Sequence, residues 1–109
     1  MEMVAKAAGL AKRDGANVSV MSVALDESDE QEARVNVDKA ASLLRSLEVE
    51  PTNLFIETGN PVEEIIKAGS NYSFIILGDT GKTGIKRFFL GSVAFKVMEY
   101  ASNSVMVVR

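Results

Sequence analysis

The sequence contains no cysteine, no histidine and no tryptophan among its 109 residues. Without cysteine the chain can form no disulfide, no zinc–thiolate site and no thiol nucleophile. Without histidine it can form no Ser-His-Asp triad and has no imidazole to serve as general base or metal ligand. Proton chemistry is therefore restricted to carboxylates, lysines and the two tyrosines.

Long apolar runs and a surplus of basic residues are missing as well. No apolar run approaches the ~20 residues that a membrane-spanning helix requires, and the charged N-terminus lacks the apolar stretch of a signal peptide. The net charge of −3 argues against general nucleic-acid binding, which needs excess Lys and Arg. We therefore expect a cytoplasmic protein that binds neither nucleic acid nor a membrane.

What is present is the composition and length of one ordinary globular domain, spanning residues 1–109. Hydrophobic periodicity and turn signals predict helices that alternate with strands. The predicted strands are residues 17–25, 54–58, 74–77 and 104–108, and the predicted helices are residues 3–13, 30–47, a third starting after Asn60, and 92–101. Such alternation predicts an α/β fold in three layers, α/β/α, with an open and mainly parallel sheet.

Local signals support the helix ends. Gly15 can take the left-handed position that ends the first helix. Ser28 or Asp29 can cap the second helix, and Asn60 followed by Pro61 is a favourable start for the third. One stripe of the second helix is expected to be buried; it consists of Ala33, Val37, Ala40, Leu44 and Leu47.

A glycine-rich segment, residues 78–92, joins an apolar strand to the last predicted helix. Its glycines allow main-chain N–H groups to converge on an anion, and Ser92 opens a helix whose N-terminus favours phosphate. Lys82, Lys86 and Arg87 add three cations. The segment fits neither a P-loop nor a GxGxxG fingerprint; it is either a longer phosphate loop or a surface loop whose glycines serve turns.

The spacing Gly78, two residues, Gly81, nine residues, Gly91-Ser92 follows the pattern G-2x-G-9x-G-(S/T). It resembles the ATP-binding motif of the universal stress protein family. The flanking residues FIILGDTGKTGIKRFFLGSVAFKVMEYASNSVMVVR resemble the family's C-terminal third, and GANVSVMSV resembles its second strand.

The resemblance implies a universal-stress-protein-like fold (adenine nucleotide alpha hydrolase-like) with strand order 3-2-1-4-5 and a homodimer through the last strand, residues 104–108. It also implies ATP binding and a stress-response role as a sensor or regulatory module. By matching positions, the nucleotide contacts would be Val23, Leu77, Gly78, Gly81, Gly91, Ser92 and Val93. Asp79 could hold Mg²⁺ through water, although a lone Asp in a glycine turn is more commonly a turn residue.

The family's first strand has no counterpart in this sequence. In the order 3-2-1-4-5 that strand is central, so its absence would leave the strands at 17–25 and 74–77 with unpaired edges. Three explanations are open: the two strands close up, another chain supplies a strand, or a longer protein carries an N-terminal segment. An interaction module without nucleotide binding is the alternative function, and a nucleotide-transfer enzyme is disfavoured because no histidine is present.

Overall fold

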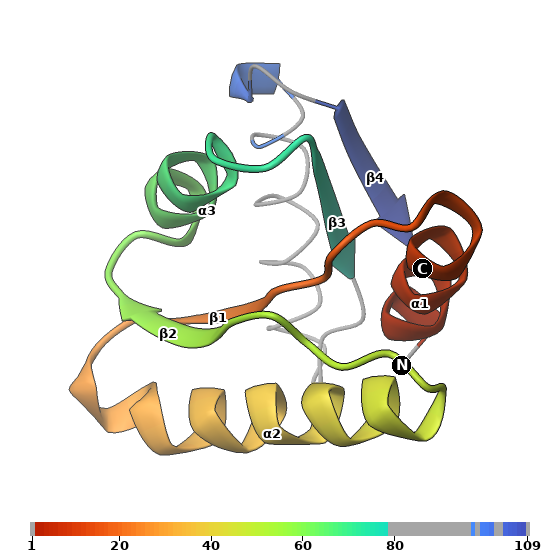
Figure 1. Ribbon diagram of the computed structural model, residues 1–109. Helices are drawn as coiled ribbons and strands as arrows, with labels where there is room; N and C mark the ends of the chain where they lie inside the picture. Colours follow the sequence, from red (N-terminus) through yellow and green to blue (C-terminus); the bar gives the residue numbers. More distant parts are fainter. Residues whose placement is uncertain (1, 79–96, 98, 102–103, 109) are drawn as a thin grey trace.

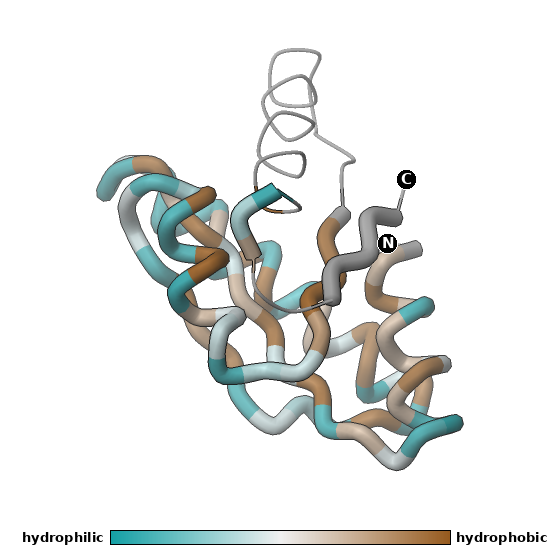
Figure 2. Tube along the Cα trace, turned by 90° about the horizontal axis from the view of Figure 1, so that it is seen from above, coloured by the Kyte–Doolittle hydropathy of each residue, from teal (hydrophilic) through white to brown (hydrophobic). Residues whose placement is uncertain are grey.

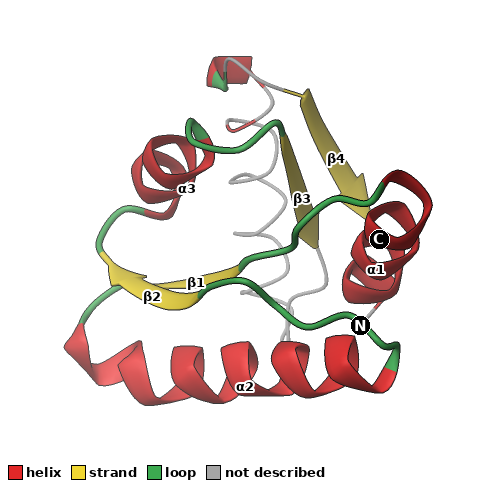
Figure 3. Cartoon of the chain, in the orientation of Figure 1, coloured by secondary structure: helices red, strands yellow, loops and turns green. Residues whose placement is uncertain are grey.

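The structure, a computed structural model, describes residues 2–78, 97, 99–101 and 104–108, in which helices and strands alternate along the chain (Figure 1). Figure 3 shows the same view coloured by secondary structure. The elements in chain order are α1 (Glu2–Asp14), β1 (Val20–Ala24), the short 3-10 helix η1 (Glu27–Asp29), α2 (Glu30–Ser46), β2 (Leu54–Thr58), α3 (Pro61–Gly69), β3 (Phe74–Gly78) and β4 (Ser104–Val108). Most of the predicted helix 92–101 lies outside the described residues.

The predicted helix ends are confirmed for α1 and α3. Gly15 follows α1 with φ +67°, a left-handed conformation that glycine adopts without steric cost. At the start of α3, the Asn60 side chain accepts a hydrogen bond from the Glu63 N–H at 3.1 Å, and Pro61 occupies the first turn.

The predicted cap of α2 is wrong. Asp29 occupies the N-cap position but makes no side-chain capping bond. The carboxylate that makes a capping bond is Asp26, the N-cap of η1, which accepts from the Ser28 N–H at 2.9 Å and from the Ser28 hydroxyl at 2.5 Å. The reason is that the turn η1 precedes α2, so the first free N–H groups occur one turn earlier than the periodicity suggests.

The strands form two separate parallel pairs. In the first pair Val20 lies opposite Leu54 and Ala24 opposite Thr58, and in the second Phe74 lies opposite Ser104. Within the described residues β1 and β3 are not hydrogen-bonded to each other. The described strands β1 and β3 therefore do not close up into one sheet, which was one of the three explanations given above.

Helices cover both faces of the β1–β2 pair. Helices α2 and α3 both contact these strands, and Figure 1 shows them on opposite sides. This arrangement is expected because right-handed crossovers that run in opposite directions along a sheet place their helices on opposite faces. Helix α1 packs against α2 and also contacts β3 and β4.

The core lies between α1 and α2, where the cluster Val4, Ala8, Ala40 and Leu44 is buried. The predicted stripe of α2 is confirmed, since Ala33, Val37, Ala40 and Leu44 are all buried; Leu47 is partly buried and packs on the cluster. Figure 2 shows hydrophobic and hydrophilic segments alternating along the helices, as an amphipathic pattern requires.

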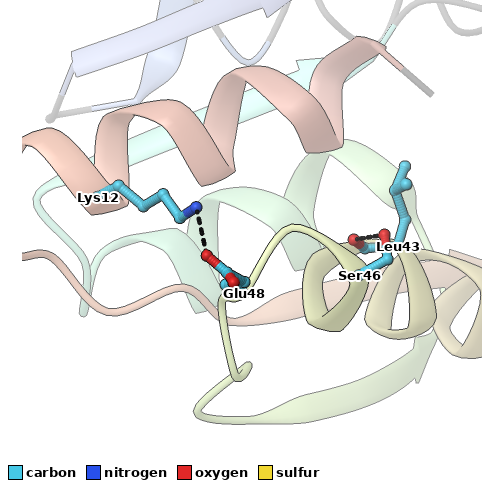
Figure 4. Close-up of polar contacts among 4 residues, drawn as sticks. All are labelled: Lys12, Leu43, Ser46 and Glu48. Atoms are coloured by element: carbon cyan, nitrogen blue, oxygen red, sulfur yellow. Dashed lines mark hydrogen bonds and ion pairs between the residues drawn. The ribbon is translucent and has the colours of Figure 1, made fainter.

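Polar contacts at the end of α2 lie on the surface (Figure 4). The Lys12 ammonium of α1 lies 3.4 Å from the Glu48 carboxylate, and both side chains are mainly exposed. The Ser46 hydroxyl donates to the Leu43 carbonyl at 2.6 Å. Exposed ion pairs contribute about 0–1 kcal/mol, so the buried apolar cluster, rather than this pair, holds α1 against α2.

Candidate functional site

A cavity of about 940 Å³ lies where β1 and β3 face each other. All five residues of β1 line it, as do Phe74–Leu77 of β3, and α1, α2 and α3 add further walls that are mainly apolar. Small-molecule sites in proteins typically measure about 300–1,000 Å³ and have mostly apolar walls with a few polar groups. The cavity is therefore a candidate binding site by size and lining.

Two of the predicted site residues meet at this cavity. Val23 of β1 and Leu77 of β3 both line it, and both are partly buried. Gly78 is the last residue of β3 and lies opposite Val108, so the glycine-rich segment leaves the sheet at the carboxyl end of β3. In open α/β sheets ligands bind outside that end of the strands.

The rest of the predicted nucleotide contacts cannot be placed. Gly81, Gly91, Ser92 and Val93 lie outside the described residues, as does Asp79. The structure thus describes the strand side of the predicted site and leaves its loop side as a prediction.

The main chain of Val23 faces away from β2. The Val20 N–H donates to the Asn53 carbonyl at 2.9 Å, and the Gly59 N–H donates to the Ala24 carbonyl at 2.8 Å. Because successive residues of a parallel strand direct their main-chain groups to alternate sides, Val20, Ser22 and Ala24 point theirs towards β2. Val23 therefore presents an N–H donor and a C=O acceptor on the cavity side of β1.

Polar side chains at the cavity were not found by sequence reasoning. Ser22, Asp29 and Asn36 line it from β1, the end of η1 and α2. The available signal was position, because Asp29 lies in the segment that follows the carboxyl end of β1, where α/β proteins place binding groups. Because the sequence pattern predicts Asp29 as the start of a helix, its position at the cavity was not predicted.

The acidic turn after β1 carries one perturbed carboxyl group. Hydrogen bonds from the Ser28 hydroxyl, and next from its main-chain N–H, lower the pKa of the exposed Asp26 below its usual value. Asp26 is therefore firmly ionised at neutral pH and contributes negative charge to the turn that follows β1.

Two further kinds of site were sought in the part of the chain that the structure describes. There, no group of three or more His, Cys, Asp or Glu side chains comes together as a metal site. Likewise, none of the helices described has the length and apolar character needed to cross a membrane.

Comparison with known proteins identifies a single family. The family model described as the universal stress protein family matches residues 1–109. A universal stress protein of Methanocaldococcus jannaschii is 42% identical over 53 residues, which make up 47% of this chain and 31% of that protein. The match thus spans about a third of this curated relative.

Solved structures of the same family share the fold. A universal stress protein from Archaeoglobus fulgidus in complex with dAMP has a TM-score of 0.77 at 22% identity, covering 98% of this chain and 85% of its own. A universal stress protein in complex with cAMP has a TM-score of 0.75 at 17% identity, covering 99% of this chain and 85% of its own. The predicted α/β fold with a parallel sheet is confirmed.

Proposed function

Because the chain belongs to the universal stress protein family, we propose that it binds an adenine nucleotide, ATP first, and acts in the cytoplasm as a sensor or regulatory module of stress response. The observation that carries the proposal is the meeting of Val23 and Leu77, from strands far apart in sequence, on one cavity of ligand size. That two structural neighbours were solved with dAMP and cAMP supports the choice of an adenine nucleotide.

The Val23 main chain suits an adenine base. The purine edge offers an N6–H donor next to a ring-nitrogen acceptor, and Val23 offers one acceptor and one donor on the cavity side. The apolar side chains of Val23 and Leu77 would contact the ring faces, which removes apolar area from water. Two correctly placed hydrogen bonds in an otherwise apolar pocket are typical of how such sites select a ligand.

The phosphates would lie on the glycine-rich segment. Gly78, Gly81, Gly91 and Ser92 would supply N–H groups and a hydroxyl to the phosphates and ribose, with Val93 beside them, and the N-terminus of the predicted helix 92–101 would favour the negative charge. Mg²⁺ would accompany ATP through its phosphate oxygens, with Asp79 reaching it through water. Since the chain has no histidine to act as general base, any hydrolysis should be slow.

Calorimetric titration of ATP with Mg²⁺ tests the proposal. Gly91→Val places a side chain where the main chain would approach phosphate, and Ser92→Ala removes one donor; each should weaken ATP binding at least about tenfold, the loss expected for one charge-assisted hydrogen bond. Gly9→Ala and Ser42→Ala, on exposed positions of α1 and α2, are the matched controls and should bind as the unmodified chain does. Unchanged affinity in both loop variants would contradict nucleotide binding by this motif.

A second candidate function is dimerisation. Within the described residues β4 pairs with β3 on one side only, and a strand edge is a template for another strand. We propose that residues 104–108 pair with a second copy. Light scattering over a range of concentrations should then give twice the monomer mass; a monomer mass at high concentration would contradict it. A dimer that gives no heat with ATP would favour an interaction module over a nucleotide sensor.

A further inference from the structure

The Asp29 carboxylate lines the cavity without a partner in the described part of the chain. Asp29 ends η1 and is the N-cap of α2, yet it makes no side-chain capping bond, because Asp26 makes that bond one turn earlier. The Asp29 N–H donates to the Asp26 carbonyl at 3.1 Å, but among the described residues its partly buried side chain takes part in no hydrogen bond or ion pair. Such a carboxylate favours a ligand that brings a hydrogen-bond donor.

Asp29 lies at the same end of β1 as the proposed base contact. Val23 is the last residue but one of β1, and η1, which follows after a short turn, contacts this strand. Both Val23 and Asp29 line the cavity. The proposed function places the phosphates on the glycine-rich segment, which begins at the end of β3. A base held at Val23 is therefore the part of the nucleotide nearest to Asp29.

The charge around Asp29 is negative. Glu32 lines the cavity one turn further along α2, and the ionised Asp26 belongs to the same turn. Arg13, the cation among the described lining residues, lies near the end of α1 and pairs with Asp14 at 3.4 Å. Because a carboxylate only accepts hydrogen bonds, this end of the cavity suits a donor and repels both a phosphate group and a carbonyl oxygen.

We propose that Asp29 determines which base the site accepts, an inference that rests on the proposed nucleotide function. The adenine N6 amino group carries two hydrogens; the Val23 carbonyl would accept one and the Asp29 carboxylate the other. Guanine and hypoxanthine carry the carbonyl oxygen O6 at the same position, and the carboxylate repels it. A site selects most sharply when it combines a hydrogen bond to the correct ligand with repulsion of the wrong one.

Calorimetric titration of the full chain with ATP and with inosine triphosphate, each with Mg²⁺, tests the proposal. Asp29→Asn keeps the size of the side chain but offers an amide that can donate to O6. Inosine triphosphate should then bind at least about tenfold more tightly, the effect of one hydrogen bond to a charged or neutral partner, and ATP should bind more weakly. Asp29→Ala should also weaken ATP binding, with a smaller gain for inosine triphosphate.

The matched control is Asp38→Asn, the same change at an exposed position of α2 that does not line this cavity. It should leave both affinities unchanged. Circular dichroism checks that each variant is folded. A purely structural role of Asp29 would weaken both ligands equally, which would overturn the proposal.

The outcomes separate this inference from the proposed function. If the unmodified chain binds ATP but the ratio of the two affinities is the same in Asp29→Asn, the inference fails and the proposed function stands. If Asp29→Asn weakens ATP but not 2′-deoxyadenosine triphosphate, the carboxylate binds the sugar and the proposed selection of the base is wrong. If the unmodified chain does not bind ATP, the proposed function fails and this inference fails with it.

Discussion

The two strand pairs of the molecule are supported very differently. The β1–β2 pair lies between α2 and α3, and α2 is the helix that contacts it most and has five buried side chains. The β3–β4 pair is contacted by α1, and at its start Phe74 remains 44% exposed. Ile75 is the buried hydrophobic residue of β3.

The two strand pairs therefore differ in the apolar helix faces that cover them, and not in their main-chain pairing. Each pair has a parallel register of five residues, so their main-chain ladders are comparable. Among the described residues, what the first pair has in addition is a helix packed on each face. We therefore expect the β1–β2 unit to carry most of the stability of the described chain, and β3 to gain most from an occupant of the cavity.

Leu44→Ala should lower the stability of the β1–β2 unit more than the other substitutions below. Leu44 is 1% exposed at the centre of the core cluster, and truncation of a buried leucine lowers the free energy of unfolding by about 2–5 kcal/mol. Urea denaturation measures the loss. Leu54→Ala, at a position of β2 that is 40% exposed, is the control and should lose about 1 kcal/mol or less. Equal losses would mean that the α1–α2 core does not dominate stability.

Asn60→Ala tests the second helix that covers the β1–β2 pair. The Asn60 side chain caps α3 through the Glu63 N–H, and loss of such a cap costs about 1 kcal/mol. Asp29→Ala is matched to it, since Asp29 is the N-cap of α2 but makes no capping bond, and should cost less. Denaturation midpoints report both, and a larger loss for Asp29→Ala would contradict the assignment of the caps.

Gly69→Ala sharpens the comparison where α3 meets β3. A methyl group at Gly69 would lie 2.9 Å from Ile75 Cγ1, and Ile75 would have to move. At Gly9 nothing lies within 4 Å, so Gly9→Ala should raise the free energy of unfolding by about 0.5–1 kcal/mol, the usual helical preference for alanine. Thermal unfolding of Gly69→Ala should show no such increase in stability. An increase equal to that of Gly9→Ala would show that Gly69 of α3 does not pack tightly against Ile75 of β3.

The smallest effect is expected in the acidic turn that follows β1. Because the folded pKa of Asp26 is lowered, its contribution to stability is complete above the unfolded value near 3.8 and is lost as the pH falls through the lower folded value. Asp26→Asn and Ser28→Ala should each reduce the slope of stability against pH in that acidic range. Urea midpoints measured from pH 2 to pH 5 check this, and an unchanged slope in both variants would contradict the hydrogen-bonded turn.

The sequence predicts the local elements well because local physics determines them. Strand 54–58 and the Asn60–Pro61 helix start are confirmed at the predicted residues. The predicted strand 17–25 is observed as Val20–Ala24 because β1 is paired only as far as the five residues of β2 extend. Pairing between distant strands has no periodic signature, so neither the register nor the separation of the two pairs could be derived from composition or spacing.

The candidate site could be predicted only in part. Val23 and Leu77 came from a resemblance in motif, and the structure brings both to one cavity. That the main chain of Val23 faces this cavity depends on the register with β2, which the sequence does not encode locally. Asp29 and Asn36 were missed because, on a helix start and a polar helix face, they are indistinguishable from solvated positions.

The parallel registers also constrain how the chain folds. Val20 and Leu54 are 34 residues apart in sequence, and Phe74 and Ser104 are 30 apart, so neither pair can form as a hairpin and each must close a long loop. Because closure entropy changes slowly with loop length, by about 0.6 kcal/mol per doubling, the two closures cost nearly the same. In the described part of the chain, α2 packs on both β1 and β2, so collapse of this helix onto its strands favours closure of the first loop. We expect the β1–α2–β2 unit to form the folding nucleus and the β3–β4 pair to assemble after it.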